Sequence, residues 1–428
     1  MAQGYTGYNI IDNAITYKDS ANLDAFSRLR VSNPLTIFSN QFTYDKSPYV
    51  YEEITNNNPQ TDAKYDTTER IVKLQIKPGS LAGDYMYMQS YEYIPYQPGR
   101  SQLVFLTFNF FPSPVSSTAP PGTSDKVIGL SDGSNGFEFV YDVGLMQPCF
   151  VIRTTTSAGI QIVDQPNWNL DRLDGTGPSG ITLNLYKTQI LVIDFQALYV
   201  GRVRMGFDID GTIVYAHEFL HANSFNFPYI MTANLPVRAG IISQGAGLDD
   251  EMFFICASVA SEGGTEDAQR FGYNFVYTGS YINLPVGLTY VFTLSPALLF
   301  GGITNRVKFV LESVEFMNVG TKPAQWSLGI GSALTTPTWN NVNLNTSSMQ
   351  YDTTAAAAGA LSVVIDGGYV AAGTAGRAGI SSEAVSSKYP ISLSASGAKR
   401  DNGNLTLFAT AIGGNTDFYY SIKWKEIR

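Results

Sequence analysis

The sequence has little charge, two histidines, two cysteines and no long apolar run. Charged residues make up 15% of the 428 residues, and Asp plus Glu exceed Lys plus Arg by 36 to 27. The net charge of −9 comes without any basic cluster, which argues against a nucleic-acid-binding surface, because neutralising phosphates requires grouped Lys and Arg. The absence of a run of 18 apolar residues predicts no membrane-spanning helix. The start, MAQGYTGYNII, lacks the basic and apolar regions of a secretory signal, so we expect no signal peptide.

The two cysteines, Cys149 and Cys256, lie far apart and fit no metal-ligand spacing. Free cysteine is among the most buried residue types, which favours two buried thiols over a disulfide, although the sequence leaves both open. The sequence has no nucleotide-binding loop, no catalytic Cys–His arrangement and no cofactor fingerprint. We therefore expect no cofactor and no catalytic residues.

Aromatic residues and turn formers are abundant instead. Aromatics make up 13% of the chain, which also contains 40 Gly and 20 Pro. Many short apolar stretches separated by Gly and Pro turns are typical of all-β proteins. A chain of this length fits two or three domains. The composition predicts an all-β fold with more than one β-sandwich.

The clearest local pattern is a hairpin around Asp210-Gly211. Val203 to Ile209 alternates apolar and polar residues with a period of two, as does the return strand from Thr212 to Phe219. Gly supplies the positive φ that a two-residue turn requires. The apolar run Ile190–Phe195 just upstream predicts a central strand that is buried on both faces. Adjacent strands of this kind must pack on a second sheet, so the sequence predicts a β-sandwich.

The sequence suggests an extended N-terminal arm at 1–45 and two sandwich domains. The larger domain is expected at 46–280, and the order of its strands resembles the concanavalin-like and laminin-G type of jelly roll. The amino-acid composition changes near 279–288, after which the chain is richer in Ala, Ser and Thr, and this change predicts a smaller C-terminal sandwich at 281–428. In that domain, the alternation slips by one position at Glu312–Ser313, which indicates a β-bulge.

Several phrases resemble a family of uncharacterised virion structural proteins of tailed bacteriophages. They are DAFSRLRVSNPLTIF (24–38), LDGTGPSG (173–180), IDFQALYVGRVRMGF (193–207), HANSF (221–225), NLPVR (234–238) and SIKWKEIR (421–428). The resemblance covers most of the chain and implies a place on a virus particle. It implies no reaction and no catalytic residues.

The arm is the candidate assembly device. Its apolar residues show no period that would allow it to form its own sheet or helix, so we expect it to pack on its own sandwich or on a neighbouring subunit. Arg28 and Arg30 are expected to pair with carboxylates. The residues proposed for assembly are Tyr5, Tyr8, Ile10, Ile11, Phe26, Arg28, Leu29, Arg30, Leu35 and Phe38.

One motif matches a metalloprotease pattern. His217, Glu218 and His221 satisfy H-E-x-x-H, whose chemistry requires a helix that places both imidazoles on one face. Here the motif continues a predicted strand, on which His217 and Glu218 point to opposite faces. We therefore interpret it as a chance match and expect no metal site. Two turn clusters, Asp132–Glu138 and Asp208–Asp210, could offer oxygens to Ca²⁺, but turn formation already explains them.

The sequence therefore predicts a non-enzymatic structural component of a phage virion, either a head decoration or a tail, neck or fibre protein. Its expected partners are further copies of itself, with a trimer favoured, and other virion proteins. The alternative is a carbohydrate-binding adhesin that contacts a host surface glycan through the lectin-like sandwich.

Overall fold

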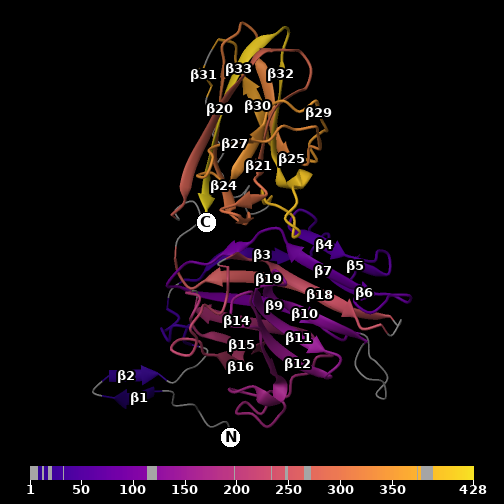
Figure 1. The fold of residues 1–428 in the computed structure, drawn as a ribbon, viewed down its shortest axis with the longest axis vertical. Coiled ribbons are helices and arrows are strands. Elements are labelled where there is room, and N and C mark those ends of the chain that lie inside the picture. The colour runs from indigo at the N-terminus through magenta and orange to yellow at the C-terminus, as the bar shows by residue number, and fades with distance from the viewer. Residues whose placement is uncertain are drawn as a thin grey trace. The chain divides into compact units, whose positions relative to one another are not determined.

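The computed structural model describes residues 8–11, 14–17, 22–31, 33–112, 123–196, 198–232, 234–245, 249–264, 271–373, 375–376 and 389–428. The regular secondary structure of the described chain is almost entirely β-strand, and the chain separates into two compact units (Figure 1). Unit 1 comprises 1–47, 53–89 and 96–264; unit 2 comprises 48–52, 90–95 and 265–428. In the described part of the chain, no helix has the length and apolar character needed to cross a membrane.

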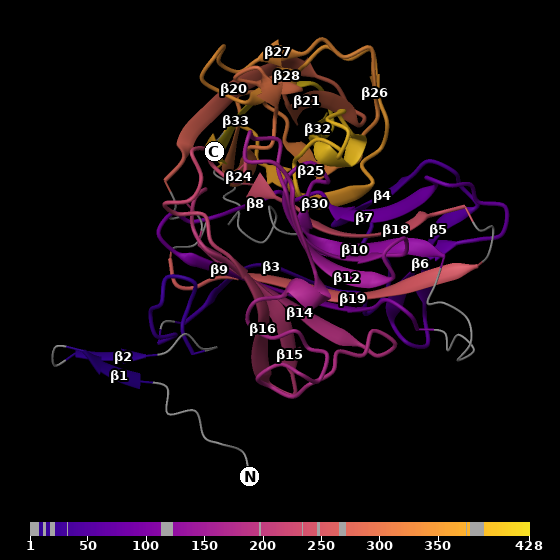
Figure 2. The same ribbon diagram turned by 60° about the horizontal axis from the view of Figure 1, so that its bottom comes forward.

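Unit 1 is a sandwich of a seven-stranded and an eight-stranded sheet. The first has the order β13-β12-β11-β10-β18-β7-β4; the second has the order β16-β15-β14-β9-β19-β6-β5, with β3 also pairing on β19 (Figure 2). Its elements are β1 (Tyr8–Ile11), β2 (Ala14–Tyr17), β3 (Leu35–Gln41), β4 (Tyr51–Thr55), β5 (Thr61–Asp66), β6 (Ile71–Ile76), β7 (Tyr85–Ser90), β9 (Ser101–Asn109), β10 (Ser124–Ser131), β11 (Gly136–Asp142), β12 (Gln147–Arg153), β13 (Gln161–Asp164), the 3₁₀ turn η1 (Gln165–Asn167), β14 (Gln189–Gln196), β15 (Val203–Ile209), β16 (Thr212–Phe219), β17 (Asn234–Leu235), β18 (Val237–Ser243) and β19 (Asp250–Ser261).

Aromatic side chains fill the space between these two sheets. The rings of Phe137 on β11 and Phe195 on β14 are 4.6 Å apart, and Phe139 lies edge-on to Phe207 of β15 at 5.2 Å. Each pair joins the inner faces of opposite sheets. Such contacts add about 0.5–1.5 kcal/mol per pair to the area that they bury. The predicted sandwich is thus confirmed, and so is the buried central strand, because β14 lies between β9 and β15.

Unit 2 is a smaller sandwich. A four-stranded sheet, β20-β33-β24-β31, faces a six-stranded sheet, β27-β28-β21-β32-β25-β30. Its elements are β8 (Ile94–Pro95), β20 (Tyr273–Leu284), β21 (Thr289–Pro296), β22 (Leu299–Phe300), β23 (Ile303–Thr304), β24 (Lys308–Asn318), β25 (Ala324–Ile330), β26 (Leu334–Thr335), β27 (Asn340–Asn341), β28 (Met349–Asp352), β29 (Ala357–Ala358), β30 (Val363–Val370), β31 (Ala375–Gly376), the 3₁₀ turn η3 (Asp401–Gly403), β32 (Leu405–Ala411) and β33 (Thr416–Ile427).

The boundary between the sandwiches differs from the expected position at 280. β20 pairs along the length of β33, and Tyr277 of β20 stacks on Phe292 at 4.8 Å within the core of unit 2. The strand therefore belongs to the second sandwich, whereas its alternation alone did not reveal which sheet it joins. The predicted bulge is present, because the pairing of β24 with β33 shifts between Leu311 and Ser313.

One expectation for local structure was wrong. The N-terminal arm was expected to lack strands. Instead, β3 joins the eight-stranded sheet and buries Phe38, while β1 and β2 pair with each other, placing Tyr8 opposite Tyr17. Phe38 is the only buried residue of β3. The strand therefore lacks the regular alternation of apolar and polar residues that would have indicated it in the sequence.

The hairpin turn provides a direct test of the local structure. Asp210 and Gly211 have φ values of 52° and 81°, so both central residues are left-handed, as a type I′ turn requires. A Cβ at Gly211 would have open space around it, so the cost of a substitution comes from the backbone alone. We expect Gly211→Val to lower the free energy of unfolding by about 1–2 kcal/mol or more. Gly211→Asn should cost much less, because Asn tolerates this conformation. Equal urea midpoints for the two variants would contradict this turn geometry.

Candidate functional site

The outer face of the seven-stranded sheet of unit 1 carries a hollow. Strand alternation sends Phe137, Phe139 and Tyr141 of β11 into the core and leaves Glu138 and Val140 on the outer face. Neighbouring strands contribute residues at the matching register positions. The hollow has a volume of about 290 Å³ and is lined by Tyr87, Asp125, Val127, Gly133, Glu138, Val140, Asp142, Cys149, Val151, Arg153, Ile162, Arg238 and Ile242.

A tyrosine is fixed on this face by a glycine and an arginine. Gly240 of β18 lies opposite Tyr87 of β7, and a Cβ at Gly240 would be 1.9 Å from the Tyr87 ring. The missing side chain therefore provides room for the ring. The guanidinium carbon of Arg238 is 3.9 Å from the ring centroid, and its Nη1 donates to Gln89 Oε1 at 3.0 Å. Burial raises the pKa of Tyr87 above its ordinary value.

Charged groups lie on both sides of this ring. Glu138 accepts hydrogen bonds from Ser131 Oγ at 2.7 Å and from Arg153 Nε at 2.5 Å. Farther along the sheet, burial and then the negative charge of Asp142 raise the pKa of Asp125. The face therefore combines an aromatic ring, aliphatic surface and oriented polar groups, which is the usual composition of a small-ligand site.

The carboxylates on β11 do not have the spacing for glycoside hydrolysis. Glu138 and Asp142 are four residues apart on one extended strand, which separates their backbones by about 13–14 Å at about 3.4 Å per residue. Val140 takes the position between them. Paired glycosidase carboxylates lie about 5–5.5 Å apart in retaining enzymes and about 6.5–9.5 Å apart in inverting enzymes. The hollow is therefore better suited to binding than to hydrolysis by this pair.

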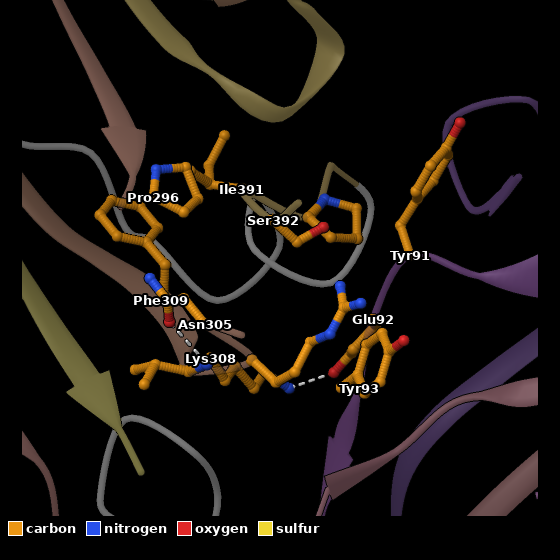
Figure 3. Close-up of a pocket in the computed structure, with 12 residues that line it drawn as sticks. Tyr91, Glu92, Tyr93, Pro296, Asn305, Lys308, Phe309, Ile391 and Ser392 are labelled. Atoms are coloured by element: carbon orange, nitrogen blue, oxygen red, sulfur yellow. Dashed lines mark hydrogen bonds and ion pairs between the residues drawn. The ribbon is translucent and has the colours of Figure 1, made fainter. Parts of the chain in front are cut away.

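A pocket in unit 2 is too small for an organic ligand. Its volume is about 20 Å³, enough for about one water molecule. Figure 3 shows Lys308 extending toward Glu92, with which it forms a buried ion pair, and Tyr93 beside that carboxylate. The guanidinium carbon of Arg306 is 4.2 Å from the centroid of the Tyr93 ring. These contacts hold the segment 90–95 on unit 2 and leave no room for a substrate.

A buried carboxylate organises the N-terminal part of unit 1. Asp194 of β14 is fully buried, and its Oδ2 accepts from Arg30 at 2.6 Å, from Arg204 at 2.5 Å and from the Tyr215 hydroxyl at 2.8 Å. Its Oδ1 accepts from Ser101 Oγ at 2.5 Å. Two guanidinium groups thus share one carboxylate, and the surrounding hydrogen bonds offset the cost of removing these charges from water.

This network attaches residues 22–31 to the sandwich. Arg204 donates to the carbonyl of Leu23 at 2.7 Å, and Gln196 Nε2 donates to the carbonyl of Ala25 at 2.9 Å. Arg30 also forms an ion pair with Glu262 at 2.6 Å. Burial raises the pKa of Glu262, an effect that the charge of Arg30 opposes. The segment is therefore an integral part of unit 1.

The proposed assembly residues consequently have different surroundings. Arg28 pairs with Asp24 and Arg30 with Asp194 and Glu262, which confirms the expected pairing with carboxylates. Leu29 is 44% exposed, Phe26 and Leu35 are half-buried and Phe38 is buried in the same unit. Tyr5 lies outside the described residues, and Tyr8, Ile10 and Ile11 belong to β1. Of the two placements expected for the arm, on its own sandwich or on a neighbouring subunit, residues 22–31 and 33–41 have the first.

The histidines of the H-E-x-x-H motif have separate structural roles. His217 lies on β16, as predicted, and its Nδ1 accepts the backbone N–H of Asn169 at 3.2 Å. The His221 ring stacks on Tyr229 with centroids 4.0 Å apart, and its Nδ1 is 2.8 Å from the carbonyl oxygen of Gly201. In the described part of the chain, no three His, Cys, Asp or Glu side chains are arranged to hold a metal ion.

The environment of His217 predicts a pH dependence of stability. Burial lowers the pKa of His217 to about 4 from an ordinary 6.5. Because the folded pKa is depressed, the neutral ring stabilises the fold above pH 6.5, and this contribution is lost as the pH falls toward 4. We expect wild type to lose more stability than His217→Asn across this window, since Asn keeps an acceptor but does not titrate. Urea midpoints at several pH values measure the difference, and parallel curves would contradict this assignment.

The remaining candidates are explained by structure. Asp132 and Asp208 accept backbone N–H groups within their own turns, in agreement with the turn interpretation of both clusters. Both cysteines are free thiols: Cys149 is buried, whereas Cys256 is half-buried and lies 3.1 Å from Thr107 Oγ1. Burial raises the pKa of Cys149 to about 11, so this thiol is a poor nucleophile at neutral pH.

Sequence patterns alone did not reveal the residues that define the hollow and the buried network. Asp194 lies within the apolar run ILVIDF, and a lone carboxylate in such a run indicates a buried partner. The partners Arg30 and Arg204 could not be assigned without the fold. Tyr87 and Arg238 had no local signal, because only sheet register brings them together.

No protein-family model matches the chain, and no curated protein matches it in sequence. Among solved structures, it is similar to an endo-1,3-beta-glucanase from Streptomyces sioyaensis, with 11% identity, 53% of this chain and 96% of that chain covered, and a TM-score of 0.36. It is also similar to a legume lectin-like domain from Entamoeba histolytica, with 9% identity, coverage of 52% and 95%, and a TM-score of 0.33. For lectin II from Ulex europaeus, the identity is 13%, the coverage 53% and 99%, and the TM-score 0.32.

Proposed function

We propose that this chain is a non-enzymatic structural component of a tailed-phage virion that acts through protein–protein assembly. The proposal rests on the resemblance stated above, and the observation that supports it is where the phrases of this chain that carry the resemblance lie in the fold. DAFSRLR (24–30) supplies Arg30, IDFQ (193–196) supplies Asp194, and GRVR (201–204) supplies Arg204. Phrases separated by more than 160 residues thus contribute to one buried network.

The network has an architectural role. Its charged groups are buried or half-buried and bind one another, so they are not available to a substrate. In this chain, these phrases attach the N-terminal segment to the sandwich. An assembly protein depends on such rigidity, whereas an enzyme would be expected to place reactive side chains in an open cleft. Its partners on the particle would be further copies of itself and other virion proteins.

Mass spectrometry of gradient-purified virions tests this proposal. A phage that encodes the chain should contain it in the particle at a fixed ratio to the major capsid protein, and the chain should remain bound after a high-salt wash. Recovery of the chain only in the lysate, outside the particle, would overturn the proposal.

A second candidate function is glycan binding on the outer face of the seven-stranded sheet. The observation that favours it is the hollow around Tyr87, where a fixed ring lies beside Arg238 and the Glu138–Arg153 pair. Aromatic rings pack against the C–H faces of sugars, and oriented charged groups bind their hydroxyls. The lectins similar to this chain are named as sugar-binding proteins, but the proposal rests on the side chains present here.

A glycan array with matched variants tests this second function. Tyr87→Ala should remove the binding of any glycan that wild type retains, and circular dichroism should show that the variant remains folded at the temperature of the assay. Tyr369→Ala is the control, because Tyr369 is 72% exposed and lies on β30 of unit 2. Equal binding by wild type and Tyr87→Ala would exclude this face as the glycan site.

A further inference from the structure

β20 is a long strand at the edge of a sheet. It spans 12 residues, from Tyr273 to Leu284, and ends the four-stranded sheet of unit 2 (Figure 1). It pairs with β33 on one side, and no strand in the described chain pairs with the other side. An edge of this length exposes a row of backbone donors and acceptors that another strand can bind.

The sequence of β20 lacks the features that normally block such pairing. Between Tyr273 and Leu284 there is no Lys, Arg, Asp, Glu or Pro. Natural edge strands are usually protected by charge, proline, a β-bulge or short length. β20 has a bulge at Ile282–Asn283, but it leaves Tyr273–Tyr281 in regular pairing with β33. Four other edge strands of five or more residues carry charged or titratable side chains: β4 (Glu52, Glu53), β5 (Asp62, Lys64, Asp66), β16 (His217, Glu218) and β30 (Asp366). β3 is also uncharged, but it has only seven residues.

The two faces of β20 are clearly divided. Phe275, Tyr277 and Tyr281 pack against the core of unit 2. The outward side chains between them are exposed, and they include Val276 at 51% and Ile282 at 58%. A strand added at this edge would therefore extend both the core face and the outer face of the sheet.

We propose that β20 pairs antiparallel with β20 of a second copy of this chain. In a two-fold contact, each residue faces one at the mirrored position, so charges near the centre would meet like charges. β20 has none. Centring the pair on Gly279 places Val276 opposite Ile282, with both side chains exposed in the single chain. The same register places Tyr277 opposite Tyr281 on the core side.

This contact is independent of the proposed virion role and differs from the expected trimer. A two-fold pair joins the four-stranded sheets of two copies into one continuous sheet. The β1–β2 hairpin of a second copy is the competing occupant of the edge, because a two-stranded sheet alone is marginally stable. The pairing of β20 with itself is favoured, since the register above matches side chains on both faces.

Sedimentation of the full chain tests the contact. We expect wild type to be dimeric at micromolar concentration and Thr278→Lys to be monomeric, because Lys at an edge blocks strand addition and Thr278 is exposed at the centre of β20. Val364→Lys is the control: Val364 is 60% exposed on the edge strand β30, and this variant should remain dimeric. Circular dichroism should show the same fold and melting temperature for all three proteins.

A cysteine pair tests the register. Val276→Cys with Ile282→Cys in one chain should form a disulfide between two copies under mild oxidation, whereas either single variant should not exceed the wild-type background. A monomeric wild type, or a Thr278→Lys variant that remains dimeric, would overturn the proposal. Dissociation both on deletion of residues 1–21 and with Thr278→Lys would assign the β20 edge to the hairpin of a second copy and overturn the pairing of β20 with itself.

Discussion

Asp194→Ala should lower the free energy of unfolding of unit 1 by about 3–5 kcal/mol, the usual cost of removing one partner of a buried ion pair. The carboxylate is fully buried and accepts from Arg30, Arg204, Tyr215 and Ser101. Without it, Arg204 stays buried beside Arg30, and two positive charges lose their shared partner. Chemical denaturation followed by tryptophan fluorescence measures the loss, because Trp168 is buried in unit 1.

Glu69→Ala is the matched control for the loss of one carboxylate. Glu69 is exposed in the same unit, and we expect its replacement to change stability by less than about 0.5 kcal/mol. Equal denaturation midpoints for Asp194→Ala and Glu69→Ala would show that the buried network does not hold unit 1 together.

Deleting residues 1–45 should prevent unit 1 from folding cooperatively. The deletion removes β3 from the eight-stranded sheet and the buried side chains of Leu23 and Phe38, which contribute about 1.5–3 kcal/mol each. It also removes Arg30, leaving Asp194 and Glu262 without that partner. Hydrogen exchange should show loss of protection across β9, β14 and β19, the strands nearest to the gap.

The shorter deletion of residues 1–21 separates folding from assembly. It leaves the network and β3 in place, so unit 1 should keep its melting temperature. A 1–45 deletion that melts like wild type would contradict the assignment of 22–41 to the core of unit 1.

Local patterns predicted the parts of the fold that depend on neighbouring residues. The alternation of apolar and polar residues around Asp210-Gly211 was sufficient to locate β15 and β16. The shift of this alternation by one position at Glu312 located the bulge in β24. Both features require only strand periodicity and turn chemistry. The all-β sandwich class followed from many such segments, because half-buried strands must pack on a second sheet.

Long-range pairing accounts for what the sequence analysis missed. Arg204 was expected on the polar side of a strand, but it is fully buried because Asp194 and Tyr215 lie beside it. Likewise, the sequence of β20 predicts a strand, but only the pairing of this strand with β33 shows that it belongs to unit 2. The candidate binding face was not predictable, since Tyr87 and Arg238 are brought together only by the register of β7 and β18.

A cryo-electron microscopy map of the intact virion tests most directly the proposal that this chain is a building block of a virus particle. We expect repeated density in the particle that fits the two β-sandwiches, with the segments 22–31 and 33–41 packed on the larger one. A complete map whose every protein density is assigned to other chains would contradict it.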